Sequence, residues 1–279
     1  MIGNKPFSVC MSVYYRDNPK WFCQAVESVL NQTVKPNEII LVVDGPVTDE
    51  LNQAISKYEE VDLFKIIRLE ENMGHGEARR TGLENCKNEL VALMDADDIS
   101  VRDRFEKQLE AFCDERLSIV GGNIAEFVGS ENNVVGLRTV YMTDSEIKKD
   151  MKKRCPMNQV TVMFKKSDIE QAGGYLDWYC EEDYYLWLRM YLKGMKFANL
   201  NDILVNVRVG EDMYKRRGGL KYFKSEFKLQ GYMLKNRIIG LGTYLINVAK
   251  RLVVQVLLPN RLRGFVFKKF ARKQAEQNL

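Results

Sequence analysis

Four short apolar runs, each followed by a segment with helical periodicity, constrain the fold of this chain more than any other feature. The runs lie at residues 7–14, 38–43, 63–69 and 90–94, and the helical patterns between them at 19–31, 47–58 and 76–86. Strands that alternate with helices are typical of βαβ units, which build a parallel sheet flanked by helices. The first half is therefore predicted to be α/β, and 279 residues suffice for one large domain with an appendage.

The second half of the chain is less regular. Its patterns predict an antiparallel pair of strands at 119–128 and 134–141, a polar helix at 144–153, strands at 160–165 and 203–209, and a helix at 181–193. Ser100 is predicted to cap a helix at 101–113. No change of composition separates two domains before about residue 210. We therefore expect these elements to belong to the same domain as the first half.

Three carboxylates follow the apolar run at 90–94: Asp95, Asp97 and Asp98. Open α/β sheets bind their ligands at the carboxyl ends of strands, and in a loop Asp95 and Asp97 can both reach one divalent cation. Hard oxygen ligands suit Mg²⁺ or Mn²⁺, and these ions suit a diphosphate. The alternative is an acidic turn that opens the next helix, because acidic residues commonly begin helices.

Charge is distributed unevenly along the chain. Residues 214–279 hold 16 Lys and Arg against 2 Asp and Glu, a net charge of +14, whereas residues 1–213 hold 26 against 36, a net charge of −10. A basic segment suits an anionic membrane surface or a nucleic acid. The six cysteines are scattered without a Cys-x-x-Cys pair, and residues 1–8 lack the features of a signal peptide. Both observations predict a cytoplasmic protein with reduced thiols.

Several strings of sequence together resemble one enzyme family. They are SVYYRDNP…AVESVLNQT, EIILVVDGP, ENMGHGEARRTGLENCKNELVALMDADDIS and GGY…EEDYYLWLRM, within about residues 7–210. In this order and at these spacings they resemble the inverting family-2 glycosyltransferases of the GT-A fold. The resemblance is nearest to enzymes that assemble bacterial exopolysaccharide, capsule or O-antigen. It implies an α/β fold with a Rossmann-like, mixed, mainly parallel sheet flanked by helices, in a catalytic domain of residues 1–212.

The resemblance also implies a site for a nucleotide sugar, with a UDP-sugar as the expected donor. Asp44, at the end of the second run, would accept the N–H of the uracil ring, although an Asp-Gly-Pro sequence is also an ordinary turn. Tyr14 and Asn72 would lie against the nucleotide. Arg79 would donate to the diphosphate, as a planar guanidinium is suited to do. Arg80 stands where many relatives have Asn, so the sequence leaves open which arginine faces the ligand.

The resemblance assigns the chemistry to two acidic groups. Asp97 would bind the metal, and Asp95 would contact the ribose or assist the metal. Asp183 would be the general base that removes the proton of the acceptor hydroxyl, with Glu182 beside it. The alternative for Asp183 and Glu182 is that they form an ordinary acidic first turn of a helix. Many relatives have a metal-binding His near the position of Gly210, and this chain has none there.

Two tryptophans, a leucine and the single histidine lie within or between these motif strings. Trp187 and Leu188 have the spacing of buried helical residues. Trp178 lies in the preceding loop and is the candidate for stacking on a sugar. His75 stands in a loop without an evident base or metal partner, and we expect no catalytic role for it.

The basic segment, residues 213–279, is predicted to be a helical tail that lies on a membrane. Ile238–Leu258 is long enough to span a bilayer, but Lys250 and Arg251 near its middle favour a helix in the interface. Its apolar face would contain Leu245, Val248, Leu252 and Val256, and basic residues would continue after Pro259. The alternative is a helix packed on the catalytic body or on a second subunit. No nucleic-acid motif accompanies the charge, so no nucleic acid is expected.

These features predict a cytoplasmic, membrane-associated glycosyltransferase with Mg²⁺ or Mn²⁺ as its cofactor. Its acceptor is expected to be a saccharide, by resemblance a lipid-linked oligosaccharide. Two alternatives stay open: a metal-dependent phosphatase, and a non-catalytic nucleotide-sugar-binding or scaffold protein docked by its tail. The donor sugar, the linkage and the oligomeric state are not predicted.

Overall fold

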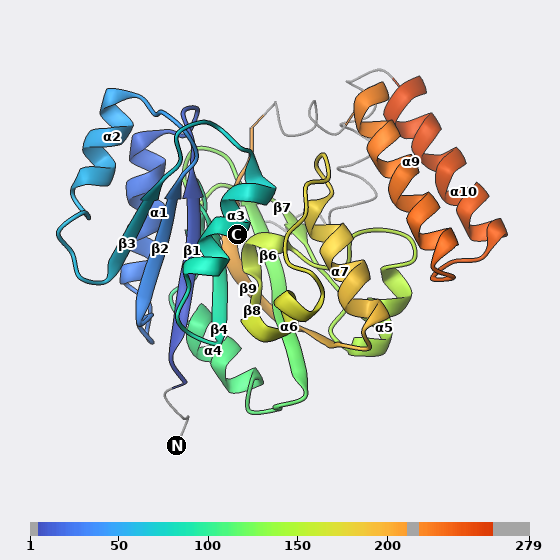
Figure 1. Cartoon of the computed structure of the whole chain (residues 1–279), viewed down its shortest axis with the longest axis horizontal. Helices are drawn as coiled ribbons and strands as arrows, with labels where there is room; N and C mark the ends of the chain where they lie inside the picture. Colours follow the sequence, from blue (N-terminus) through green and yellow to red (C-terminus); the bar gives the residue numbers. More distant parts are fainter. Residues whose placement is uncertain (1–4, 211–217, 259–279) are drawn as a thin grey trace.

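The computed structural model describes residues 5–210 and 218–258, and its first half is the predicted α/β sheet (Figure 1). Four parallel strands lie side by side in the order β3 (Phe64–Arg68), β2 (Glu38–Val43), β1 (Phe7–Val13) and β4 (Leu90–Asp95). Residues of β1 pair with both neighbours, Ser12 facing Val42 on one side and Asp95 on the other. This register brings the carboxyl ends of β1, β2 and β4 to one edge.

Alternate side chains of these strands enter two different cores, because neighbouring residues of a strand point to opposite faces. Val9 and Met11 of β1 pack with α1 (Pro19–Leu30) and α2 (Asp49–Ser56), whereas Cys10 packs with α3 (His75–Asn85) on the other face. Asn18 and Thr48 cap the first two helices through their side-chain oxygens. The sheet therefore has helices on both faces, as the alternating pattern predicted.

The remaining strands extend the sheet beyond β4. Within the described residues nine strands form one sheet, continued by β8 (Met163–Lys165), β6 (Leu117–Phe127), β9 (Lys196–Arg208) and β5 (Ile99–Ser100), with β7 (Val134–Arg138) also paired to β6. The predicted antiparallel pair is β6 with β7, and its prediction is confirmed. β6 and β9 are parallel and form the longest strand pairing among the residues that the structure describes.

Three predicted boundaries are wrong for reasons that lie in the tertiary structure. Ser100 caps no helix: it belongs to β5, which pairs with β9, and the next helix is α4 (Arg104–Ala111). The run at 160–165 begins as a 3₁₀ turn, η1 (Gln159–Thr161), held by the Thr161 hydroxyl group, which donates to the Asn158 carbonyl (2.7 Å). The last strand begins at Lys196 because residues 196–200 pair with β6.

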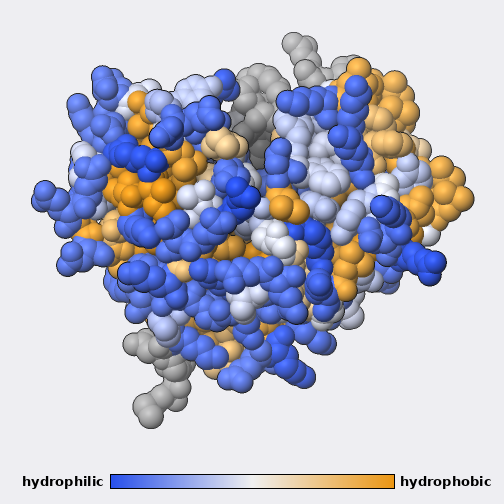
Figure 2. Space-filling view, in the orientation of Figure 1, coloured by the Kyte–Doolittle hydropathy of each residue, from blue (hydrophilic) through white to orange (hydrophobic). Residues whose placement is uncertain are grey.

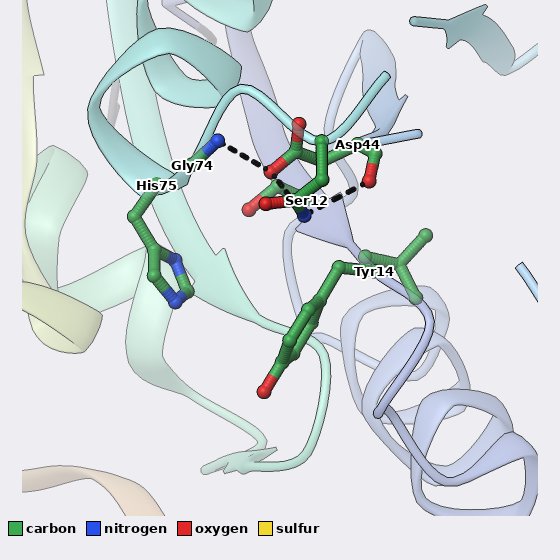
Figure 3. Close-up of a pocket in the computed structure, with 7 residues that line it drawn as sticks. Ser12, Tyr14, Asp44, Gly74 and His75 are labelled. Carbon is green, nitrogen blue, oxygen red and sulfur yellow. Dashed lines mark hydrogen bonds between the residues drawn. The ribbon is translucent and has the colours of Figure 1, made fainter. Parts of the chain in front are cut away.

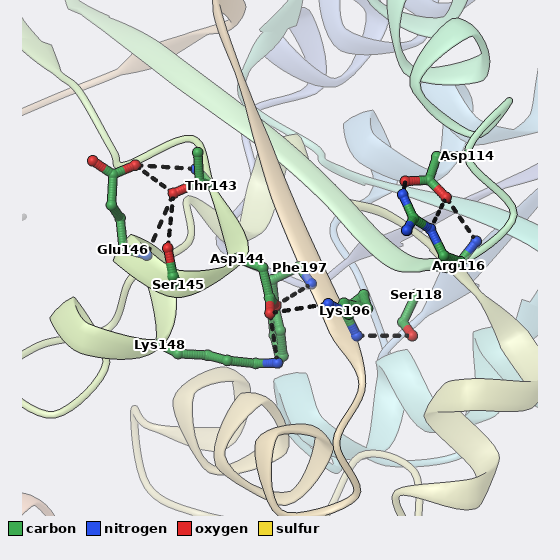
Figure 4. Close-up of polar contacts among 10 residues, drawn as sticks. All are labelled: Asp114, Arg116, Ser118, Thr143, Asp144, Ser145, Glu146, Lys148, Lys196 and Phe197. Carbon is green, nitrogen blue, oxygen red and sulfur yellow. Dashed lines mark hydrogen bonds and ion pairs between the residues drawn. The ribbon is translucent and has the colours of Figure 1, made fainter.

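The first turn of α5 (Asp144–Asp150) anchors this half of the molecule to β9 (Figure 4). Thr143 and Glu146 form a reciprocal capping box. The carboxylate of Asp144 accepts the backbone N–H of Phe197 (2.9 Å) and pairs with Lys148 (2.9 Å). Two further helices, α6 (Lys166–Gln171) and α7 (Glu182–Leu192), follow, and Trp187 and Leu188 of α7 are fully buried, as predicted.

Two helices form an antiparallel pair beside α7, at the right of Figure 1: α9 (Leu220–Lys235) and α10 (Leu241–Leu252), with a π-helical turn, η2 (Val253–Leu257), after them. Leu229 and Met233 of α9 belong to the same core as Trp187. The helix predicted at 238–258 begins later, at Leu241, because Arg237 has a positive φ of 58° and Ile238 and Ile239 are buried in the connection between α9 and α10. The predicted domain boundary, at 212/213, and the basic residues after Pro259 lie outside the described residues.

Helix length also bears on the tail. None of the helices in residues 5–210 and 218–258 combines the length and apolarity that crossing a bilayer requires.

Candidate active site

A pocket of about 90 Å³ lies where β1 and β2 end and α3 begins (Figure 3). Its lining includes Ser12 and Tyr14 from the end of β1, Asp44 from the end of β2, and Asn72 and His75 from the loop and first turn of α3. Parallel strands carry side chains from distant parts of the sequence to one such edge. The structure thus brings together three residues that the sequence assigned to the nucleotide: Tyr14, Asp44 and Asn72.

Asp44 holds the wall of this pocket in place. One carboxylate oxygen accepts the backbone N–H of Met73 (2.7 Å), and the other accepts the backbone N–H of Gly74 (3.0 Å) and the Asn72 amide (3.0 Å). Gly45, at φ 83°, makes this approach possible, because a Cβ atom there would lie 2.5 Å from the Asn72 nitrogen. A carboxylate has about four acceptor sites, so Asp44 keeps capacity for a further donor.

Arg79 is the residue that joins the two predicted acidic groups. Its guanidinium is buried and donates to Glu182 (2.7 Å) on α7 and to Asp95 (3.3 Å) at the end of β4. Burial lowers the pKa of Arg79, but Asp95 and Glu182 raise that pKa by more, so the side chain stays charged. Arg80 points outward and pairs with Glu77, so Arg79 is the arginine that faces the site.

Arg208 stabilises the loop that contains Asp97 and Asp98. The Arg208 side chain donates to the backbone oxygen of Asp97 (3.1 Å), and its backbone N–H donates to the Asp98 carboxylate (2.8 Å). The guanidinium lies between the rings of Trp21 and Phe127, 4.7 Å from each centroid. Arg208 therefore orders the carboxylate loop through backbone contacts and ring packing.

Asp183, the predicted general base, is half-buried in the first turn of α7. Its carboxylate accepts the backbone N–H of Tyr184 (2.6 Å), and burial, followed by the charge of Glu182, raises its pKa to about 6. The Cys155 thiol lies 3.7 Å from its second oxygen. The side-chain amide of Gln159 satisfies both of its neighbours when its nitrogen faces Asp183 and its oxygen faces Arg79. In this orientation the nitrogen donates to the second Asp183 oxygen (3.3 Å) and the oxygen accepts from Arg79 (3.1 Å). Gln159 thus links the predicted base to the predicted diphosphate arginine.

Several residues of this site were not predicted from the sequence. Ser12 and His75 line the pocket, Gln159 and Cys155 contact Asp183, and Asp17 accepts the Tyr14 N–H (2.9 Å). Burial and the Arg79 charge lower the pKa of His75, which makes the neutral ring dominant at pH 7. His75 directly follows Gly74, whose backbone N–H donates to Asp44. This position next to Gly74 was the only feature of the sequence that could have placed His75 in the pocket.

Trp178 has a structural role in addition to any contact with a sugar. Its ring lies 4.4 Å from that of Tyr185, and its indole N–H donates to the Ser225 backbone oxygen of α9 (3.3 Å). Glu181, directly before Glu182, accepts the hydroxyl hydrogen of Tyr222 (2.7 Å) from the same helix. Helix α9 therefore contacts the loop and the helix start that carry the predicted base.

Comparison with known proteins decides the family. Residues 8–169 match the family described as glycosyl transferase family 2. The chain belongs to this family. The transferase is 37% identical over 268 residues to the UDP-Gal:alpha-D-GlcNAc-diphosphoundecaprenol beta-1,3-galactosyltransferase of Escherichia coli, covering 96% of this chain and 97% of that one. It is 34% identical over 267 residues to the amylovoran biosynthesis glycosyltransferase AmsE of Erwinia amylovora, covering 94% and 98%.

A solved structure shows the same fold. The mannosyltransferase PcManGT of Pyrobaculum calidifontis, in complex with GDP-Man and Mn²⁺, superposes with a TM-score of 0.62 at 14% identity, over 95% of the transferase and 80% of that protein. The predicted GT-A fold and the predicted glycosyltransferase family are confirmed.

The carboxylates at the end of β4 have the chemistry of a divalent-cation site. Burial, followed by the negative charges of Asp97 and Asp95, raises the pKa of Asp17 to about 7, and the same causes raise the pKa of Asp98. Such mutual repulsion is relieved by a cation. No group of three or more His, Cys, Asp or Glu in the described ranges is arranged to hold an ion. Two carboxylates supply only part of a coordination sphere, and hard oxygen donors of this kind suit Mg²⁺ or Mn²⁺.

Proposed function

We propose that the transferase moves a sugar from a UDP-sugar to a hydroxyl group of a lipid-linked saccharide, with inversion at the anomeric carbon. The reaction belongs to bacterial surface polysaccharide synthesis and takes place at the cytoplasmic face of the membrane. The observation that carries the proposal is the chain Asp95–Arg79–Gln159–Asp183, which connects the carboxylates expected at the diphosphate to a buried carboxylate whose pKa is about 6. The names of the two relatives support the substrate class.

The donor is held by the pocket and by Arg79. The remaining acceptor capacity of Asp44 suits the ring N–H of uracil, and Tyr14 and His75 supply ring surfaces on either side of the pocket. Arg79 donates toward the diphosphate from a position fixed by Glu182. Bound at Asp97 and Asp95, Mg²⁺ or Mn²⁺ would neutralise charge on the departing diphosphate. The neighbour solved with GDP-Man and Mn²⁺ supports this cofactor.

Asp183 acts on the acceptor. Its ionised carboxylate accepts the proton of the acceptor hydroxyl group as the oxygen attacks the anomeric carbon from the side opposite to the leaving diphosphate. A base with a pKa of about 6 is ionised at pH 7 and still basic enough to take part in proton transfer. Gln159 and the Tyr184 N–H hold the carboxylate in place, so little reorganisation is needed during the reaction.

Binding of nucleotide sugars, measured by thermal shift with and without Mn²⁺, tests the donor half of this proposal. We expect one UDP-sugar to raise the melting temperature, to do so more in Mn²⁺, and to lose the Mn²⁺-dependent part in Asp97→Ala. A GDP-sugar that stabilises as well as every UDP-sugar would contradict the assignment of Asp44 to uracil. Stabilisation by a UDP-sugar without any transfer to an acceptor would instead favour a non-catalytic binding protein.

A further inference from the structure

Helix α10 and the turn η2 have the distribution of side chains reversed from that of an ordinary surface helix. A surface helix normally buries its apolar stripe and exposes its polar one. Here the buried residues are Asn247 in α10 and Gln255 in η2, both polar. The side chain of Arg251 is also largely buried, with 13% of it exposed. The polar side of this helix therefore faces the protein.

Specific hydrogen bonds fix this orientation. The Asn247 amide donates to the Lys152 backbone oxygen and to the Gln230 side chain of α9, each at 2.9 Å. Arg251 pairs with Glu226 of α9 and donates to the Lys153 backbone oxygen (3.0 Å). Rotation of the helix about its axis would leave these buried groups without partners, and that is costly. The reversed orientation is thus built into the packing.

The opposite side of α10 and η2 exposes large apolar side chains. Six of them, here called the outer face, are between 39% and 65% exposed: Leu241, Leu245, Ile246, Leu252, Val253 and Leu257. Figure 2 shows the corresponding hydrophobic surface gathered at the edge of the molecule where α10 lies. Exposed apolar patches that are bordered by polar residues commonly mark sites of interaction.

Helix α9 places positive charge beside this apolar surface. Lys221, Lys224, Lys228 and Lys235 are exposed. In residues 218–258 seven Lys and Arg stand against one acidic residue, Glu226, and that residue is buried in its pair with Arg251. In Figure 2 the hydrophilic surface over α9 borders the apolar surface over α10. The sequence continues after residue 258 with six further basic residues and one acidic residue.

We propose that the α9–α10 pair docks on an anionic lipid bilayer, with the outer face of α10 inserted among the acyl chains near the headgroups and the α9 lysines on lipid phosphates. Apolar insertion combined with neighbouring lysines is the pattern of interfacial helices. A second copy of this chain is a poorer occupant, because an isologous contact through this surface would bring the lysines of both copies together. The proposal rests on the proposed function in one respect: docking places the enzyme at the bilayer, where the lipid-linked acceptor of the proposed function lies.

The inner side of the same pair contacts the segments around the predicted base. Asn247 and Arg251 hold the backbone of residues 152 and 153, shortly before Cys155, whose thiol lies beside Asp183. On the other side, Tyr222 of α9 holds Glu181. The docking pair and the segments next to the predicted base are therefore one packed unit.

Flotation of the full chain with lipid vesicles tests the docking surface without any need for activity. We expect binding to vesicles of phosphatidylcholine with phosphatidylglycerol, and much weaker binding to phosphatidylcholine alone. The double substitution Leu245→Gln/Ile246→Gln should weaken binding by about 100-fold or more, since each side chain loses the burial of a large apolar group. The matched control replaces two apolar side chains exposed elsewhere, Val61→Gln/Val135→Gln, and should bind as the unaltered chain does.

A second pair of substitutions tests the electrostatic part. Lys224→Gln/Lys228→Gln should weaken binding to the anionic vesicles by about 30-fold at low salt, and the difference should shrink as salt is added. The control Lys57→Gln/Lys87→Gln removes the same charge at exposed positions outside the pair. No binding of the unaltered chain to anionic vesicles, or equal binding by Leu245→Gln/Ile246→Gln, would overturn the proposal. So would a dimer that becomes a monomer in that variant, which would assign the outer face to a second copy.

Transfer assays separate a failure of docking from a failure of the proposed function. With a short-chain acceptor in detergent-free solution, Leu245→Gln/Ile246→Gln should retain the turnover of the unaltered chain. With the acceptor anchored in anionic vesicles, the same variant should lose at least about tenfold in rate. Absence of transfer by the unaltered chain to both acceptors would contradict the proposed function and leave the flotation result as it stands.

Discussion

Replacement of Asp183 by Asn should make the protein more stable and much less active. The carboxyl group has a pKa of about 6 in the folded protein against an ordinary value of 3.8, a difference that corresponds to about 3 kcal/mol once the group is ionised. Solvent that reaches the partly exposed side chain screens some of this cost. We therefore expect Asp183→Asn to raise the free energy of unfolding at pH 8 by about 1–3 kcal/mol.

The pH dependence of this gain follows from the sign of the shift. The folded state binds the proton more tightly than the unfolded state, so the cost of ionisation is absent below pH 4, grows between pH 4 and about 6, and is constant above that. Urea unfolding at pH 4 and pH 8 measures it. Asp62→Asn, at an exposed aspartate before β3, is the matched control and should change stability at neither pH.

Activity supplies the second half of the same test. Loss of a general base lowers the rate by about 10²–10⁴-fold, so Asp183→Asn should lower kcat by that factor while UDP-sugar affinity stays near that of the unaltered chain. Unchanged kcat would refute the assignment of Asp183 as the base. Equal stability of the two proteins at pH 8 would refute the claim that burial destabilises the ionised form of this carboxyl group.

Three further measurements test the ionisation of Asp183, the contacts of Arg79 and the packing of α3. The rate of the unaltered chain should rise with pH through about pH 6 and then level off, because Asp183 must be ionised; a profile that falls over this range would contradict that. Arg79→Lys should lower kcat/KM by about 10–100-fold, since one ammonium group cannot replace the fork that joins Glu182 and Asp95; Arg80→Lys is the control. Gly82→Ala should lower stability by about 1–3 kcal/mol, because its Cβ atom would lie 2.4 Å from the Cys10 sulfur, whereas Gly231→Ala, in open space on α9, should raise it by up to about 1 kcal/mol. Equal melting temperatures for these two glycine variants would contradict the packing described for α3.

The sequence predicted well those parts of the fold that depend on local patterning. The bounds of β2 and the alternation of strands with helices followed from apolar periodicity alone, and the motifs carried the family. Residues that pair across long distances were harder to place. Residues 196–200 were not predicted to be a strand and belong to β9 because they pair with β6. Ser100 has the chemistry of a helix cap but pairs with β9.

The site shows the same division. Tyr14, Asp44 and Asn72, which the resemblance assigned to one nucleotide site, line the same pocket. The choice between Arg79 and Arg80 required the structure, in which only Arg79 points to Glu182 and Asp95. Gln159 lies in a segment without a motif, and its place between Arg79 and Asp183 depends on the turn η1. The tail was predicted as an amphipathic helix, but which of its faces meets the protein follows only from the partners of Asn247 and Arg251.

The anomeric configuration of the product is the best test of whether Asp183 activates an acceptor hydroxyl group for direct attack on the donor sugar. The purified full chain, Mn²⁺, a UDP-sugar chosen by thermal shift and a lipid diphosphate-linked saccharide would be incubated together, and the new linkage examined by NMR spectroscopy. We expect a single transferred sugar whose anomeric configuration is opposite to that of the donor, and about 10²–10⁴-fold slower formation of this product with Asp183→Asn. Retention of the donor configuration would contradict this expectation, because direct attack by a hydroxyl group activated by Asp183 can only invert that centre.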